Sequence, residues 1–388
     1  MFVSQGSKPL RLGFLPETDC APIVAAQELG IFKRYGLTVE LQSQASWKHV
    51  HDKIIYGQLD AAHAPAMLPF LIRLGLCSEA ANCITGLVLS LQGNGITISR
   101  QLWNQGVRDA GTMREQMWKD RHKRIYTFGV SCPLSSQYAL LCGWLRSPGS
   151  PPYTEVRIDT VAPEQMFPLL KLGYLDGYCS GEPWNSVAVQ AGVGVCMATS
   201  AELAPMHPEK VLLVREEFAQ SHADEHERLI AALIEACALC DDPRQRASLC
   251  EILAQSRYVN APVDCLKPGL TELSRPSSTV SSGAPSIQNS NIPIFQSLSS
   301  IFSRSRANEP AAAKSAWLTG RLFEFLRWPS RPAALSKVFR PDIYRRAVGL
   351  IPSANIKLQT PNTKANAKLQ TSNTKLQKKR PPGLVSAI

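Results

Sequence analysis

Two copies of one short phrase constrain the fold of this chain more than any other feature of its sequence. Gly57–Met67 reads GQLDAAHAPAM, and Gly173–Trp184, which begins 116 residues later, reads GYLDGYCSGEPW. Glycine suits the left-handed turn that ends a helix, leucine suits a position under a sheet, and aspartate accepts backbone N–H bonds at turns. Either copy alone would indicate an ordinary helix-to-strand connection. Together they predict two similar connections at matched places in two lobes.

Segments with alternating strand and helix patterns surround both copies of the repeat. The pattern predicts strands over 10–16, 37–44, 124–132 and 155–162, and helices over 20–36, 45–57, 134–147 and 163–173. This alternation is typical of α/β lobes, each with a mostly parallel sheet flanked by helices. Ligands of such sheets bind beyond the carboxyl ends of the strands. We therefore expect the residues after each repeat to form two walls of one cleft.

Composition changes along the chain suggest how it is divided. We predict a first part of lobe I over 1–95, lobe II over 96–212, and a return to lobe I with C-terminal helices over 213–351. A Ser-, Pro- and Asn-rich stretch over 268–310 is predicted to be a linker. Residues 352–388 repeat KLQT and NTK with few apolar residues, which predicts a disordered basic tail.

The net charge of +11 is distributed unevenly. Residues 1–266 carry 23 basic and 27 acidic side chains, whereas 352–388 carry 7 basic and no acidic ones. We therefore expect no direct nucleic-acid binding by the core.

The 11 cysteines show no disulfide framework, and no export signal or membrane-spanning run is apparent. These features predict a cytoplasmic location without membrane insertion.

Three short motifs in order, QASW, GEPW and HPEK, carry a family resemblance together with the segments TDCAPIVAAQELG and GQLDAAH. The chain resembles the nitrate/bicarbonate-type branch of ABC-transporter substrate-binding proteins over roughly residues 9–260. The resemblance implies a two-lobed, periplasmic-binding-protein-like (type II) α/β fold. It also implies a small oxyanion held between the lobes, with no catalytic residue, metal or cofactor.

The resemblance further implies five ligand-binding residues, namely Trp47, Asn94, Gln137, Gly181 and Lys210. Lys210 would supply the compensating charge, and the Asn94 and Gln137 amides would donate hydrogen bonds. Gly181 would let the backbone approach the anion, and Trp47 would exclude water. Asn94 stands where this family usually has glutamine, and Gln137 where it has histidine. Lys210 favours nitrate or nitrite over bicarbonate.

Several functions remain open at this point. The first is a cytosolic nitrate or nitrite sensor that controls nitrate assimilation through an RNA-binding antiterminator-type partner. The alternative is a substrate-binding component of a nitrate ABC transporter, which would work with its permease and ATPase. A binding lobe normally fused to a transporter ATPase is a further possibility, although no Walker A motif is present. A pyrimidine-synthase-like enzyme would need a cysteine-rich iron motif, which we do not find.

Overall fold

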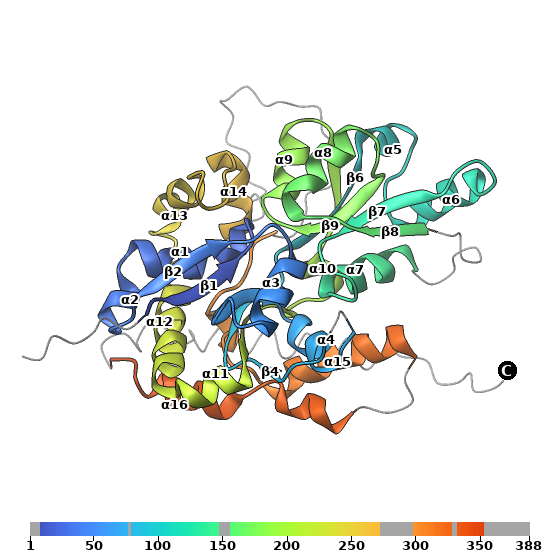
Figure 1. Cartoon of the computed structure of the whole chain (residues 1–388). Coiled ribbons are helices and arrows are strands. Elements are labelled where there is room, and N and C mark those ends of the chain that lie inside the picture. The colour runs from blue at the N-terminus through green and yellow to red at the C-terminus, as the bar shows by residue number, and fades with distance from the viewer. Residues whose placement is uncertain (1–7, 77–78, 147–155, 272–297, 328–331, 353–388) are drawn as a thin grey trace, which may run out of the picture. The chain divides into compact units, whose positions relative to one another are not determined.

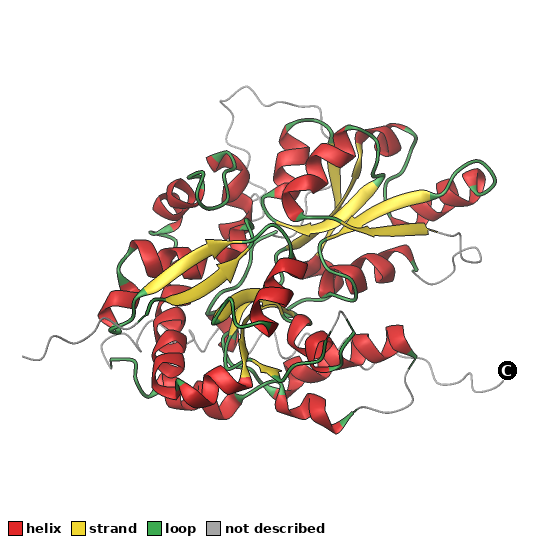
Figure 2. Ribbon diagram, viewed as in Figure 1, coloured by secondary structure: helices red, strands yellow, loops and turns green. Residues whose placement is uncertain are grey.

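Two separate β-sheets organise the chain. The computed structural model describes residues 8–76, 79–146, 156–271, 298–327 and 332–352. Its strands gather into two groups with helices on their faces (Figures 1 and 2). This confirms the predicted α/β class with two sheets. Most of the predicted linker and nearly all of the predicted basic tail lie outside the described residues.

The first sheet has the strand order β2-β1-β3-β11-β4, and β5 also pairs with β11. Its strands are β1 (Leu10–Phe14), β2 (Val39–Ser43), β3 (Ala61–Pro65), β4 (Cys83–Ile84), β5 (Val88–Leu91) and β11 (Pro208–Arg215). Strands β2, β1 and β3 are parallel, whereas β11 runs antiparallel to β3. The parallel strands therefore end at one common edge.

The second sheet has the strand order β10-β6-β9-β7-β8. Its strands are β6 (Asn94–Ser99), β7 (Tyr126–Val130), β8 (Val156–Thr160), β9 (Gly177–Gly181) and β10 (Gly194–Thr199). Strands β8, β7 and β9 are parallel, and β6 runs antiparallel to both β9 and β10. We call the first sheet with its helices the first lobe and the second sheet with its helices the second lobe.

Helices cover both faces of the first sheet. They are α1 (Ala21–Glu28), α2 (Ile31–Arg34), α3 (Trp47–Ile55), α4 (Leu68–Arg73), α11 (Glu216–Ser221), α12 (Ala223–Asp241), α13 (Arg246–Leu253), α14 (Val263–Leu270), α15 (Ala312–Leu326) and α16 (Pro341–Val348). One apolar core joins β1 and β2 to α1, α12 and α16, and another joins β3 to α3, α4 and α15. The C-terminal helices α15 and α16 thus pack on the first sheet.

The second lobe is built in the same way from shorter helices. They are α5 (Arg100–Asn104), α6 (Ala110–Asp120), α7 (Ser136–Leu145), α8 (Met166–Lys171), α9 (Trp184–Gln190) and α10 (Ser200–Leu203). Ser135 caps the start of α7, since its side chain accepts a hydrogen bond from the Tyr138 N–H at 3.3 Å. Within the described residues, no helix combines the length and apolar character needed to cross a bilayer.

Within the described ranges, the chain crosses between the lobes at two places. It leaves the first sheet between Leu91 and Asn94, where Gly93 adopts a φ of +92°. It returns between Thr199 and Pro208. The sequence assigns residues up to 212 to lobe II, but Lys210 pairs with Pro65 and Leu212 with His63 in the first sheet. The apolar run of β11 fits either sheet, so its pattern could not identify its partner strands.

Two other predictions need correction. The helix expected over 20–36 is interrupted, because Gly30 adopts a left-handed conformation with a φ of +66° between α1 and α2. The predicted linker is packed where it is described. Ile301 bridges to Leu91 and is 8% exposed, and Phe302 is 1% exposed.

The two copies of the repeat form the same turn. Gly57 and Gly173 both adopt left-handed conformations, with φ values of +67° and +77°. Leu59 and Leu175 are buried beneath their sheets. Asp60 Oδ2 accepts a hydrogen bond from the Arg11 N–H of β1 at 2.8 Å, and Asp176 Oδ2 accepts one from Thr127 N–H of β7 at 2.8 Å. Each aspartate therefore ties a helix-ending turn to the neighbouring strand, as the sequence predicts.

We expect Asp60→Ala and Asp176→Ala each to lower the free energy of unfolding by about 1–3 kcal/mol, because a part-buried N–H loses a charged acceptor. Urea denaturation followed by circular dichroism measures this. The control is Asp159→Ala, which removes a partly exposed pair with Arg157 and should cost less than about 1 kcal/mol. Equal losses in all three variants would contradict the assigned role of the repeat.

Candidate functional site

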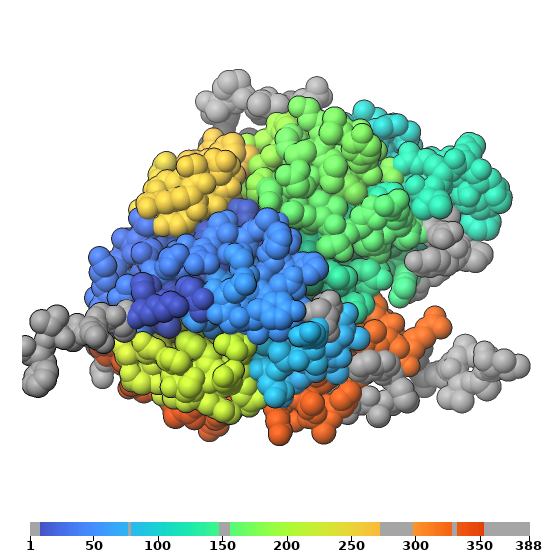
Figure 3. All heavy atoms as spheres, viewed as in Figure 1, coloured from blue at the N-terminus to red at the C-terminus, as the bar shows by residue number. Residues whose placement is uncertain are grey.

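The carboxyl ends of the parallel strands of both lobes meet at one buried junction. Trp47 opens α3 in the first lobe, and its Nε1 donates a hydrogen bond to Ser131 Oγ, just after β7 in the second lobe, at 3.1 Å. The Thr18 N–H donates to the Glu182 carbonyl at 2.7 Å, which is a second bond between the lobes. In the space-filling view, blue residues of the first lobe meet green residues of the second along this seam (Figure 3).

A chain of hydrogen bonds runs from Trp47 into the second lobe. Ser131 Oγ donates to Gln137 Oε1 at 2.5 Å, and the Ser131 N–H donates to the same oxygen at 3.1 Å. Gln137 Nε2 in turn donates to Asn94 Oδ1 at 3.0 Å. The Asn94 N–H donates to Ser200 Oγ at 3.0 Å. This chain fixes the Asn94 amide so that its Nδ2 donor is the group left over.

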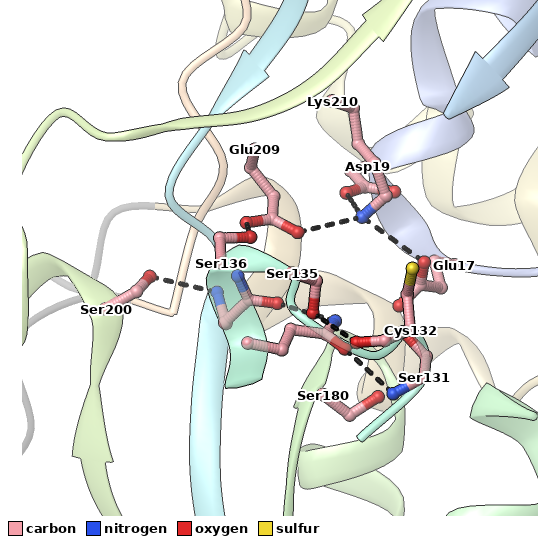
Figure 4. A network of polar contacts seen from close by, with 12 residues as sticks. Glu17, Asp19, Ser131, Cys132, Ser135, Ser136, Ser180, Ser200, Glu209 and Lys210 are labelled. Carbon is pink, nitrogen blue, oxygen red and sulfur yellow. Dashed lines mark hydrogen bonds and ion pairs between the residues drawn. The ribbon is translucent and has the colours of Figure 1, made fainter. Parts of the chain in front are cut away.

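Lys210 lies at the centre of a buried ionic cluster. Its Nζ lies 2.6 Å from Asp19 Oδ2, 3.3 Å from Glu209 Oε1 and 3.3 Å from Glu17 Oε2 (Figure 4). The lysine and Glu17 are fully buried. Nζ also lies 5.6 Å from the centroid of the Trp47 ring. Three carboxylates around one ammonium leave an excess of negative charge, unless a proton compensates for it.

The ionisation of these groups differs because their partners differ. Burial raises the pKa of Glu17 to about 7, although Lys210 opposes this shift. Burial also disfavours the charged form of Asp19, but Lys210 and His63 outweigh burial and lower its pKa. In the same way Lys210 and His207 lower the pKa of Glu209 against the effect of burial. The three carboxylates raise the pKa of Lys210 well above its usual value despite its burial.

Gly181, at the end of β9, lies against the same cluster. A side-chain carbon at this position would lie 2.7 Å from Glu17 Oε1 and 3.9 Å from Asn94 Oδ1. Only glycine therefore allows this close approach of backbone and carboxyl group. Gly181 also pairs with Asn94 across β9 and β6. The structure thus places Gly181 between the ionic cluster and the amide chain.

The structure brings all five residues predicted from the sequence to one junction. Trp47 and Lys210 come from the first lobe, and Asn94, Gln137 and Gly181 come from the second. All are buried. Their role in ligand binding stays a prediction. Lys210 differs from the expectation in one respect, because its charge is already shared with three carboxylates.

Sequence reasoning missed the acidic part of the junction. Glu17 and Asp19 follow β1, just as Ser131 follows β7. Ligands bind beyond the carboxyl ends of parallel strands, and this rule, which we applied to the residues after each repeat, would also have identified Glu17 and Asp19. Glu209 lies inside the HPEK motif beside Lys210. His63 lies in β3, and its Nε2 is 3.2 Å from Asp19 Oδ1.

Several buried polar atoms at the junction have no hydrogen-bond partner among the described residues. They are Glu17 Oε1, Asn94 Nδ2, Ser180 Oγ, Thr18 Oγ1 and His63 Nδ1, whereas Glu17 Oε2 and His63 Nε2 have ion-pair contacts with Lys210 and Asp19. Buried polar atoms are nearly always paired in folded proteins, so a cluster of unpaired ones suits a small polar ligand or ordered water. No group of three or more potential ligands in the described ranges is arranged to hold a metal ion.

A cavity of about 490 Å³ adjoins the junction. Residues of the first lobe, including Trp47, Lys48 and His51, form one side, and residues of the second lobe, including Ser131 and Thr160, form the other. Trp47 and Ser131, which form a hydrogen bond between the lobes, thus also line this cavity.

Comparison with known proteins places this geometry in a family. The model of the NMT1-like family matches residues 4–254. The nitrate import ATP-binding protein NrtC of Synechocystis sp. is 38% identical over 266 residues, which cover 68% of this chain and 40% of that protein. The nitrate/nitrite binding protein NrtA of Synechococcus elongatus is 28% identical over 361 residues, covering 89% of this chain and 78% of NrtA.

A solved structure shows the same fold. The crystal structure of the periplasmic nitrate-binding protein NrtA from Synechocystis PCC 6803 superposes with a TM-score of 0.78 at 24% identity, and 90% of each chain is covered. This chain spans only about two fifths of the length of the ATP-binding relatives such as NrtC. The chain belongs to the NMT1-like family and has the two-lobed, periplasmic-binding-protein-like fold of the nitrate/bicarbonate-type substrate-binding proteins.

Proposed function

We propose that this chain binds nitrate or nitrite at the junction of its lobes and acts as a sensor that passes occupancy to a protein partner. The observation that carries the proposal is the unpaired Asn94 Nδ2. The Asn94 amide is held by a hydrogen bond from Gln137, and Gly181 lies between this amide and Glu17 of the Lys210 cluster. A buried amide donor beside a buried ammonium suits a small oxyanion.

The five predicted residues take different roles in this proposal. Asn94 Nδ2 donates to an anion oxygen, while Gln137 orients the Asn94 amide. Lys210 supplies positive charge, and Gly181 leaves room for the anion beside its backbone. Trp47 covers the site. Because these residues come from both lobes, an anion that touches both binds the closed arrangement more tightly than an open one.

The relatives support a link between this chain and nitrate transport. Identity is higher to the ATP-binding protein NrtC, at 38%, than to the binding protein NrtA, at 28%. We therefore propose a nitrate-transport ATPase as the partner, with the RNA-binding antiterminator-type regulator as the alternative.

The ten cysteines within the described residues are all buried thiols. This supports a cytoplasmic location, because thiols persist in reducing compartments.

A second function is a substrate-binding component of a nitrate ABC transporter. It is favoured by the alignment with NrtA, which extends over 89% of this chain. We propose no catalytic activity, including the pyrimidine-synthase-like reaction, since NrtA is described as a binding protein.

The first prediction concerns anion binding. Calorimetric titration of the full chain with sodium nitrate and sodium nitrite should show one binding site. Asn94→Asp replaces the donor with a charged acceptor, so affinity should fall by about 10-fold or more. Asn104→Asp makes the same chemical change on the exposed side of α5 and should leave affinity unchanged. Absence of heat with either anion, over a wide concentration range, would refute the proposed function.

The second prediction concerns Lys210. Lys210→Met leaves three buried carboxylates without their ammonium, so the free energy of unfolding should fall by about 3–5 kcal/mol. The loss should be smaller at pH 6 than at pH 8, because Glu17, with a pKa of about 7, takes up a proton as the pH falls. Adding Glu17→Gln should recover part of the loss. A loss below about 1 kcal/mol at pH 8 would show that the cluster is not held by Lys210.

The third prediction concerns the partner. Tagged chain isolated from its own cells with and without nitrate should retain a transport ATPase in a nitrate-dependent manner. Recovery of an RNA-binding regulator instead would support the alternative partner. Recovery of the chain in a complex with a permease, independent of nitrate, would favour the transporter component over the sensor.

A further inference from the structure

We infer that Glu17 takes up a proton from solvent when the oxyanion binds, and that its neutral carboxyl group then donates a hydrogen bond to the anion. This inference rests on the proposed function, and it adds a residue that determines both the selectivity and the pH response of the site. No covalent bond changes, because the proton moves from water or buffer to one oxygen of Glu17.

The position of Glu17 supports this role. The residue follows β1 and is 0% exposed. Its Oε2 lies 3.3 Å from Lys210 Nζ, and its Oε1 points at the space above Gly181, 2.7 Å from where a side-chain carbon would lie. Neither oxygen accepts a hydrogen bond from the described residues. A carboxyl group in this place can either repel an anion or, when protonated, donate to it.

The charges around Glu17 require compensation when an anion arrives. Asp19 on its own segment and Glu209 on β11 carry negative charge, while Lys210 on β11 carries positive charge. His63 on β3 faces Asp19, and His207 faces Glu209. Cys20 and Glu182 lie close by. A monovalent anion beside three ionised carboxylates would meet strong repulsion at short range in a buried site.

Glu17 is the carboxylate that is least stabilised in its charged form. Asp19 has the shortest contact to Lys210, at 2.6 Å, and also faces His63. Glu209 accepts a hydrogen bond from Ser136 Oγ and faces His207 at 3.1 Å. Among the residues that the structure describes, the Glu17 carboxylate has an ion-pair contact only with Lys210, at 3.3 Å. The directions of the pKa shifts agree, since the pKa of Glu17 is raised to about 7 whereas those of Asp19 and Glu209 are lowered.

The consequence for binding has a definite sign. Below the pKa of Glu17 the carboxyl group is already neutral, so affinity does not change with pH. Above that pKa the free protein must first acquire a proton, so the dissociation constant should rise toward about tenfold per pH unit. A neutral carboxyl donor also requires an acceptor oxygen on the ligand, which nitrate and nitrite both provide.

The first test uses the unmodified full chain. Calorimetric titration with sodium nitrate between pH 6 and 9, in buffers of different ionisation enthalpy, gives both the affinity and the number of protons taken up. We expect the dissociation constant to rise about 10-fold between pH 7.5 and 8.5, with uptake of about one proton per nitrate at pH 8.5. A constant affinity without proton uptake would overturn the inference and leave the proposed function intact.

The second test assigns the proton to Glu17. Glu17→Gln keeps a donor but does not titrate, so its affinity for nitrate should no longer change with pH. The matched control is Glu182→Gln, because burial also raises the pKa of Glu182 to about 7 but its nearest partner is Ser186. Glu182→Gln should keep the pH dependence. If Glu17→Gln keeps it and Glu182→Gln loses it, the inference is wrong. Lack of nitrate binding at every pH would overturn the proposed function as well.

Discussion

A single buried ammonium group holds the junction of this protein together. Lys210 reaches from β11 of the first sheet to Asp19 and Glu17, which follow β1, and to its neighbour Glu209. Glu209 in turn accepts a hydrogen bond from Ser136 of the second lobe. A buried charge without partners is very costly, so the loops that carry these carboxylates must stay where Lys210 can reach them. Lys210 therefore helps to fix both walls of the junction, together with the Trp47–Ser131 and Thr18–Glu182 hydrogen bonds.

The repeated Gly-x-Leu-Asp phrase explains why much of this architecture is readable in the sequence. Local rules of turn formation predict the glycine, leucine and aspartate positions, and the structure confirms them in both lobes. Because ligands bind beyond the carboxyl ends of parallel strands, the residues after each repeat are predicted to lie at the binding site. The family resemblance then identifies Trp47, Asn94, Gln137, Gly181 and Lys210, which the fold brings together.

The remaining features depend on contacts that no local pattern encodes. The ion pair between Lys210 and Asp19 joins residues 191 positions apart. The apolar run of β11 suits either sheet, and its membership of the first sheet decides which carboxylates surround Lys210. The sequence therefore indicates the presence of a positive charge but not its neutralisation. That difference changes the chemistry expected of the site, since an anion can be accommodated only if charge is redistributed.

The burial of the junction also has a kinetic consequence. Four residues of the junction are each no more than 2% exposed, namely Trp47, Asn94, Gln137 and Lys210. Trp47 is hydrogen-bonded to Ser131, and both of these residues also line the neighbouring cavity. Opening of that bond would expose the junction to the cavity. The residence time of a bound molecule would then depend on how often the two lobes separate, and not on the strength of any single contact with that molecule. Variants at the seam would thus alter rates of exchange more than equilibrium affinity.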